Sequence, residues 1–311
     1  MDLNGLLQLT FERKASDLHL VAGVRPTLRV EGELLPVPEE PVLVPEAIDK
    51  MLQGILRPEQ REQFIVNKEI DFSLSFSEKA RFRVNAYYQK NTSAVAFRFL
   101  PLKIPPIDAL GLPGIVHNFT KLRQGLILVT GPTGHGKSTA LASILDEINM
   151  TRAEHIVTIE DPVEFIFQPQ KSIISQREMK VDTHSWEIAL RSVLREDPNV
   201  VLVGEMRDAE TIAAALTVAE TGHLVFATLH TNSAAQTIDR IVDVFPEEQQ
   251  GQTKLQLSQV LEAVFSMRLV LGTDGKRVAA GEILIGTPAV PPVIKEGKTH
   301  QIDNIIQTSA E

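Results

Sequence analysis

A glycine-rich stretch in the middle of the sequence has the residue types and spacing of a phosphate-binding loop. Backbone N–H groups of glycines converge on phosphate oxygens, a lysine reaches the β- and γ-phosphates, and a serine hydroxyl binds Mg²⁺. An apolar run at 126–130 precedes the loop and an amphipathic helical pattern follows it, which makes a chance glycine-rich turn the weaker interpretation. We therefore expect a nucleoside triphosphate and Mg²⁺ to bind at Gly131, Pro132, Thr133, Gly134, His135, Gly136, Lys137, Ser138 and Thr139, with Lys137 on the phosphates and Ser138 on the metal.

Acidic residues follow two later apolar runs. Glu160 ends the run 155–160, and Glu205 follows the run 200–204. At the carboxyl edge of a parallel sheet, a carboxylate holds Mg²⁺ or orients the attacking water. Solvated loop charges are the alternative interpretation. We expect both Glu160 and Glu205 to be catalytic. Glu205 is expected either to contact the metal beside Ser138 or to polarise the attacking water, because its side chain is longer than that of the usual aspartate.

A histidine follows the apolar run 224–229 in the same way. His230 is therefore placed to sense the γ-phosphate, although a lone histidine is more often structural or at the surface. With Lys137, Glu160 and Glu205 it completes the predicted catalytic set.

The elements that must position these residues alternate between apolar runs and helical patterns from about residue 115 onward. Each run is apolar throughout, as strands covered on both faces are. Alternating strand and helix predicts an α/β core with a doubly wound, mainly parallel sheet. The strands are expected at 126–130, 155–160, 200–204 and 224–229.

The first 100 residues have a different pattern, in which short extended segments and two helical patterns precede longer alternating segments. They predict a smaller α+β domain with an antiparallel sheet. Prolines and glycines at 101–116 indicate a linker. The expected organisation is a domain at 1–100, a linker at 101–116 and an ATPase domain at 117–311, with extended segments at 18–21, 27–30, 33–37, 70–76, 81–89 and 93–100 and helices at 45–56 and 58–65.

Composition excludes several classes of function. The net charge of -9 and the 5% aromatic content argue against direct nucleic-acid binding. No cysteine is present, so disulfides and thiolate metal sites are excluded. The sequence shows no secretory signal and no apolar run of the roughly 20 residues that a membrane helix needs. We expect a cytoplasmic protein.

Four segments in order resemble the Walker A, Asp box, Walker B and His box of secretion and pilus ATPases. They are the glycine-rich loop, Thr158–Glu164, Gly204–Thr211 and Ala227–Ala234, and the stretches 16–20 and 81–86 resemble the N-terminal domain of that family. Within the superfamily the chain is most similar to the type IV pilus retraction ATPases. It lacks the four-cysteine zinc site and the larger N-terminal region of the extension and secretion enzymes.

This resemblance implies a RecA-like core with a PAS-like N-terminal domain, ATP and Mg²⁺ as cofactors, and a homo-hexamer. It also implies an inner-membrane pilus platform protein and related pilus ATPases as partners, and a position at the cytoplasmic face of that membrane. In this family arginines of the N-terminal domain reach the nucleotide, which assigns that role to Arg81, Arg83 and Arg98. A solvated face of a strand is the alternative for these three.

Two departures from the family pattern bear on pilus retraction. Pro291 and Pro292 occupy the place of a helical motif, and we expect that they cannot both lie inside a regular helix. Relatives continue beyond the position of Glu311, so a truncated chain is expected. A motor for secretion, DNA uptake or pilus extension, and a regulatory nucleotide-binding subunit with low turnover, remain alternative functions.

Overall fold

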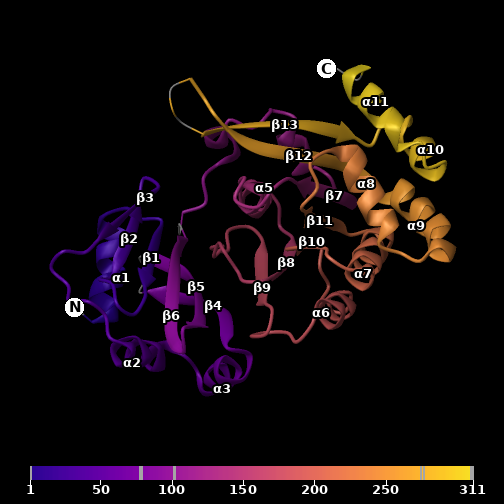
Figure 1. Cartoon of the computed structure of the whole chain (residues 1–311). Helices are drawn as coiled ribbons and strands as arrows, with labels where there is room; N and C mark the ends of the chain where they lie inside the picture. The colour runs from indigo at the N-terminus through magenta and orange to yellow at the C-terminus, as the bar shows by residue number, and fades with distance from the viewer. Residues whose placement is uncertain (1, 77–79, 101–102, 274, 276, 309–311) are drawn as a thin grey trace. The chain divides into compact units, whose positions relative to one another are not determined.

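The computed structural model describes residues 2–76, 80–100, 103–273, 275 and 277–308, and the chain separates into two compact units. Unit 1 covers Met1–Lys103 and unit 2 covers Ile104–Glu311 (Figure 1). Much of the segment in which we expected a linker belongs to unit 2, because Ile107 and Val116 are buried in one of its two cores. These two residues lie in the 3₁₀ helix η1 (Ile107–Leu110) and the short helix α4 (Val116–Phe119).

In the described part of the chain, unit 1 is a six-stranded antiparallel sheet with three helices. The strand order is β3-β2-β1-β6-β5-β4, and side chains alternate between buried and half-buried along β5. Pro45 and Pro58 lie in the first turns of two helices, where a missing N–H costs nothing. The elements are α1 (Leu3–Glu12), β1 (Asp17–Leu20), β2 (Thr27–Val30), β3 (Glu33–Pro36), α2 (Pro45–Ile55), α3 (Pro58–Asn67), β4 (Glu69–Phe76), β5 (Ala80–Gln89) and β6 (Thr92–Leu100).

Unit 2 is built on a seven-stranded sheet in the order β13-β12-β7-β11-β10-β8-β9. All neighbouring strands run parallel except the pair β12 and β13. The doubly wound, mainly parallel α/β core is therefore confirmed. The strands are β7 (Gly125–Thr130), β8 (His155–Glu160), β9 (Ile173–Glu178), β10 (Val200–Val203), β11 (Leu224–Leu229), β12 (Leu261–Leu271) and β13 (Arg277–Ile285).

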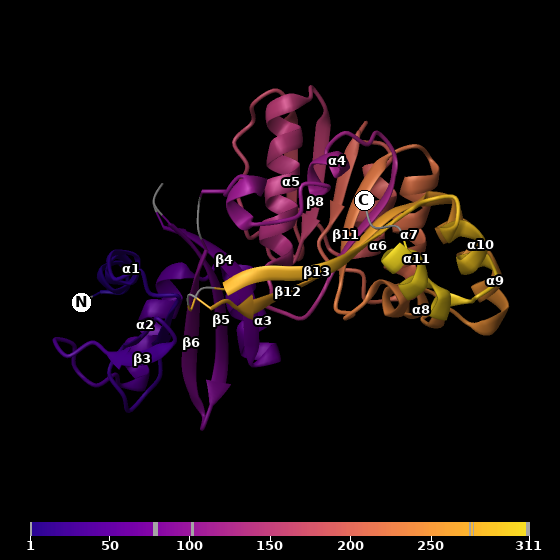
Figure 2. The same cartoon turned by 90° about the horizontal axis from the view of Figure 1, so that it is seen from above.

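Helices cover both faces of this sheet (Figure 2), and each face has its own apolar core. Alternate residues of a strand enter opposite cores, so that Ile127 packs with α5 and Leu128 packs with α7 and α8. The helices are α5 (Lys137–Thr151), α6 (Trp186–Val193), α7 (Ala209–Glu220), α8 (Ala234–Asp243), α9 (Glu247–Val260), α10 (Val290–Lys295) and α11 (Ile302–Thr308), with the 3₁₀ helix η2 at Thr299–Gln301.

The two consecutive prolines are accommodated at a helix start. Pro291 and Pro292 lie in the first turn of α10, where the N–H groups have no partner within the helix. Our expectation that both prolines cannot lie inside a regular helix was wrong, because α10 begins at Val290 and holds both in its first turn. Within the described residues, no helix is long and apolar enough to cross a membrane.

Candidate active site

The glycine-rich loop connects β7 to α5 and has a backbone that specifically requires glycine. Gly131 has a φ of +139°, and a Cβ there would lie 2.2 Å from the carbonyl oxygen of Met267 on β12. Gly136 has a φ of +89° and stands at the N-cap of α5, so the helix begins at Lys137. In this conformation the loop passes close to the sheet and turns directly into the helix.

The loop also presents several backbone donors on its open side. Within the described residues, the N–H groups of residues 133–136 donate no hydrogen bond, and Thr133 and Gly134 are exposed. Free N–H groups at the start of a helix form a site for an anion. The arrangement fits the phosphates of a nucleotide.

The side chain of Lys137 occupies the centre of the loop. Its Nζ donates to the carbonyl oxygens of Gly131 (2.7 Å) and Pro132 (3.0 Å), and the residue is 8% exposed. Burial lowers the pKa of Lys137, while the carboxylates of Glu205 and Glu164 oppose that shift. The buried ammonium therefore has neutral carbonyl oxygens as its closest partners and no carboxylate in direct contact among the described residues, which favours its transfer to an anionic ligand.

Strand order brings the other predicted residues to the same sheet edge. β7, β11, β10 and β8 are consecutive neighbours, and the ends of these four strands lead to Gly131, His230, Glu205 and Glu160. The structure thus places these predicted residues along one edge beside the loop.

Glu205 is the acceptor of a compact charged network. Arg207 contacts it in a fork, with Nε 2.7 Å from Oε1 and Nη2 2.7 Å from Oε2. His230 Nε2 lies 3.0 Å from Oε1. Burial acts to raise the pKa of Glu205, but the bond to Arg207 and the charges of His230, Arg207 and Lys137 outweigh it and lower the pKa. Glu205 is ionised at neutral pH and can accept a proton only as a weak base.

His230 connects this network to the loop. Its Nδ1 lies 3.4 Å from Lys137 Nζ and 3.4 Å from Thr133 Oγ1, while its Nε2 faces Glu205. The ring therefore spans the space between the loop and the carboxylate, which is the position expected of a γ-phosphate sensor.

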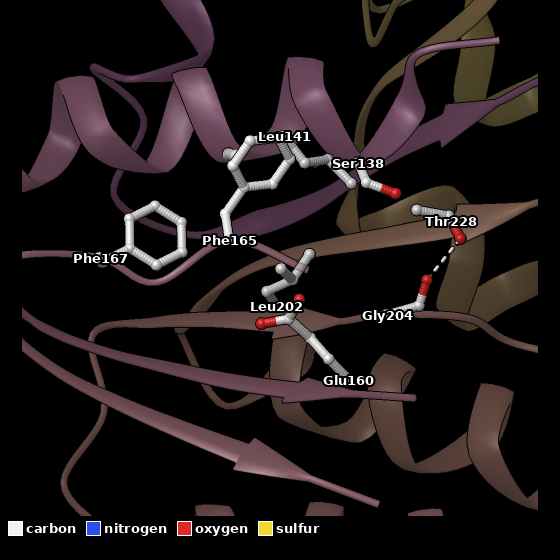
Figure 3. A pocket seen from close by; sticks show the side chains of 9 residues that line it. Ser138, Leu141, Glu160, Phe165, Phe167, Leu202, Gly204 and Thr228 are labelled. Carbon is white, nitrogen blue, oxygen red and sulfur yellow. Dashed lines mark hydrogen bonds between the residues drawn. The ribbon is translucent and has the colours of Figure 1, made fainter. Parts of the chain in front are cut away.

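Glu160 lies in a drier environment on the α5 side of the sheet. Apolar side chains, among them Phe165, Phe167 and Leu202, line a small cavity of about 40 Å³ that also reaches Ser138 (Figure 3). Burial raises the pKa of Glu160 to about 7, although Thr158 Oγ1 donates to Oε1 at 2.7 Å and acts against the rise. Glu160 is therefore in part a neutral acid at neutral pH.

Three further members of the predicted loop set differ in their surroundings. Ser138 is exposed and lines the cavity of Glu160, so its hydroxyl remains available to a metal. His135 Nδ1 accepts a hydrogen bond from the backbone N–H of Leu269 at 3.0 Å, which fixes the loop to β12. Thr139 lies in the first turn of α5, and its carbonyl oxygen accepts from Ser143 Oγ at 2.9 Å.

The three predicted arginines lie in unit 1 and have contacts within it. Arg98 Nε is 2.9 Å from Asp17 Oδ1, and Arg83 Nε is 3.8 Å from Asp71 Oδ1. Arg81 Nη2 donates to a serine hydroxyl of β4 at 2.7 Å. Their contact with a nucleotide stays a prediction.

Two residues of the site were absent from the predicted set although both lie in the recognised motifs. Arg207 follows Glu205 by two positions, and Glu164 affects the pKa of both Lys137 and Glu160. Their place in the Walker B-like and Asp box-like segments was the available signal. The pairing of Arg207 with Glu205 depends on side-chain conformation, which the motif does not encode.

Comparisons with known proteins agree with this geometry. The family model described as type II/IV secretion system protein matches residues 3–280. The chain belongs to this family. It is 47% identical over 308 residues to the type IV pilus retraction ATPase PilT of Pseudomonas aeruginosa, covering 99% of this chain and 89% of that protein. It is also 47% identical over 289 residues to a twitching motility protein of Neisseria gonorrhoeae, covering 93% and 77%.

Solved structures of related proteins have the same fold. A crystal structure of the pilus retraction motor PilT with bound ADP superimposes with a TM-score of 0.93 at 45% identity, covering 99% of this chain and 90% of that one. The ATPase DotB of Legionella pneumophila superimposes with a TM-score of 0.85 at 29% identity, covering 97% and 85%. The resemblance found in the sequence motifs is thereby confirmed.

Proposed function

We propose that this chain is a motor ATPase that hydrolyses ATP to drive retraction of a type IV pilus. The observation that carries the proposal is the juxtaposition of unpaired loop N–H groups, Lys137, Glu205 and His230 at one sheet edge. The similarity over nearly the whole chain to PilT, whose structure contains ADP, supports ATP as the nucleotide and retraction as the use of its energy.

In this proposal each residue of the site has a separate task. The loop N–H groups and Lys137 bind the β- and γ-phosphates, and Ser138 provides a hydroxyl ligand for Mg²⁺. Mg²⁺, when bound, neutralises charge that develops on the phosphate oxygens. Glu205 orients the attacking water and accepts its proton, and His230 registers the γ-phosphate between the loop and Glu205.

We further propose that the chain acts as a homo-hexamer at the cytoplasmic face of the inner membrane. A pilus platform protein and related pilus ATPases are its expected partners, and unit 1 is expected to be PAS-like. In the ring, Arg81, Arg83 and Arg98 are proposed to reach nucleotide, so that their charge stabilises the transferring phosphoryl group. The size of the purified protein with and without nucleotide tests the assembly.

Phosphate release with Mg²⁺ and ATP tests the enzymatic activity. We expect Lys137→Ala to lose both nucleotide binding and turnover, and Glu205→Gln to keep binding while losing turnover by about 10²-fold or more. Lys121→Ala is the matched control, because Lys121 is an exposed lysine of the same unit whose contact is with Asn118. A purified wild type that binds ATP without releasing phosphate identifies a regulatory subunit instead.

The use of the energy is tested in cells. Expression of the wild type in a bacterium that lacks its retraction ATPase should restore twitching motility, and Lys137→Ala should not. Restored secretion or DNA uptake without twitching would assign the chain to a different machine.

A further inference from the structure

Arg207 and Glu205 form an ion pair whose geometry differs from an ordinary surface contact. The guanidinium presents Nε and Nη2 to the two carboxylate oxygens, each at 2.7 Å. Such a fork fixes both the position and the plane of a carboxylate. The Arg207 side chain is 75% exposed and that of Glu205 is 20% exposed, so the arginine approaches from solvent and the carboxylate lies inside the site.

This pairing uses the oxygens that hydrolysis requires. Oε2 accepts from Arg207, and Oε1 accepts from Arg207 and also faces His230 Nε2 at 3.0 Å. A carboxylate that orients water must accept a hydrogen bond from that water. With a guanidinium across both oxygens, fewer lone pairs of Glu205 remain for the water, and the basicity of the carboxylate is reduced.

We propose that Arg207 is a positioning residue that latches Glu205 before nucleotide binds and releases it when the nucleotide enters. The inference rests on the proposed function of the site and adds an order of events to it. Most of the arginine side chain is in solvent, and among the described residues Glu205 is its only hydrogen-bond partner, so release requires the loss of a single pairing. Phosphate oxygens compete directly for it, since a guanidinium binds phosphate and carboxylate with the same fork.

The charges around Glu205 agree with this assignment. Burial acts to raise the pKa of Glu205, and among the groups that lower it Arg207 contributes both a hydrogen bond and its charge. The other charged or titratable groups that act on this carboxylate are His230 from the end of β11 and Lys137 from α5. The charge of Asp161, after β8, also acts on Arg207 and adds to the rise in its pKa.

A titration of Glu205 tests the latch without relying on turnover. The carboxyl ¹³C resonance of Glu205, assigned as the signal missing from Glu205→Gln, is followed against pH in protein labelled with ¹³C-glutamate. In the nucleotide-free protein we expect the midpoint to lie at lower pH in the wild type than in Arg207→Gln. Arg207→Lys, which keeps the charge and loses the fork, should lie between them. When Mg²⁺ and a non-hydrolysable ATP analogue are bound to both proteins, the wild type and Arg207→Gln should have the same midpoint.

Controls separate the latch from a general charge effect. Arg191→Gln also removes one exposed arginine, from the pair with Glu187 on α6, and should leave the Glu205 midpoint unchanged. Equal midpoints for wild type and Arg207→Gln without nucleotide would overturn the latch, and a difference that persists with the analogue would overturn its release. If Arg207→Gln does not fold, Arg207→Lys supplies the same comparison. If the Glu205 midpoints of wild type and Arg207→Gln differ as expected but the wild type releases no phosphate, the motor function is contradicted and the latch is not.

Discussion

Replacement of Glu160 by glutamine should change how the stability of unit 2 depends on pH. Burial beside Phe165 and Leu202 raises the pKa of Glu160 from 4.5 to about 7. Because the folded protein favours the neutral acid, the stabilisation is present in full below about pH 4.5 and is lost as the pH rises through about 7. Glutamine is neutral throughout, so Glu160→Gln should not show this loss.

The size of the effect follows from the pKa difference between the folded and unfolded states. A change of one unit in pKa corresponds to about 1.4 kcal/mol, so the rise in the pKa of Glu160 corresponds to about 3 kcal/mol in the free energy of unfolding. Most of that change, about 2.5 kcal/mol, falls between about pH 5 and about pH 8. The variant should therefore gain stability relative to the wild type as the pH rises.

Urea unfolding monitored by tryptophan fluorescence provides the measurement. Trp186 is the only tryptophan of the chain and packs against the core of unit 2, so its emission reports on the unit that contains Glu160. Glu210→Gln, at an exposed position in the first turn of α7, is the control, and its difference from the wild type should stay constant between about pH 6 and about pH 8. A constant difference between Glu160→Gln and wild type from about pH 5 to about pH 8 would refute the assignment of Glu160 as a buried acid with a raised pKa.

Two other substitutions test contacts within unit 2. His117 has Asp108 and Glu147 as hydrogen-bond partners of its two ring nitrogens, and these bonds raise the pKa of His117. The stabilisation by these bonds is present below the ordinary histidine pKa and is lost at higher pH. His117→Gln should therefore destabilise the protein more at about pH 6 than at about pH 9. An equal loss of stability at both pH values would contradict the bridge that His117 forms between Asp108 and Glu147. Gly131→Ala should lower the free energy of unfolding by about 1–3 kcal/mol more than Gly134→Ala. Both glycines have a positive φ, but only at 131 would the new Cβ meet a backbone atom. If thermal unfolding shows the same loss of stability for both variants, the clash at 131 is excluded.

The central strands were predictable from the sequence because their environment is uniform. Every residue of β7, β10 and β11 is buried, so the unbroken apolar runs gave the strands and their order along the chain. The edge of the sheet lacked such a signal. β9 is mostly polar and half-buried, so it lacks the apolar run of a central strand. The outer part of β12 exposes Val270 and Leu271, so no clear alternation distinguishes the antiparallel pair of β12 and β13 from a loop.

The residues of the site were predictable as types, whereas their pairings were not. Each strand end supplies a residue through its position alone, which is why Glu160, Glu205 and His230 were identified together. The fork of Arg207 depends on side-chain rotamers, and the dry surroundings of Glu160 depend on a loop after β8 that folds back over the α5 side of the sheet. Both are tertiary properties that no local pattern specifies.

The contrast between the two glutamates follows from which side of the sheet edge each occupies. Glu160 is the last residue of β8 and alternation turns it towards α5, where Phe165 and Phe167 exclude water and favour the neutral acid. Glu205 comes after β10 has ended, outside that apolar layer, where Arg207 and His230 favour the carboxylate. Environments that push two pKa values apart separate acid and base roles. Of the two, only Glu205 keeps a negative charge across the neutral range, which supports the proposed assignment of water activation to Glu205 and not to Glu160.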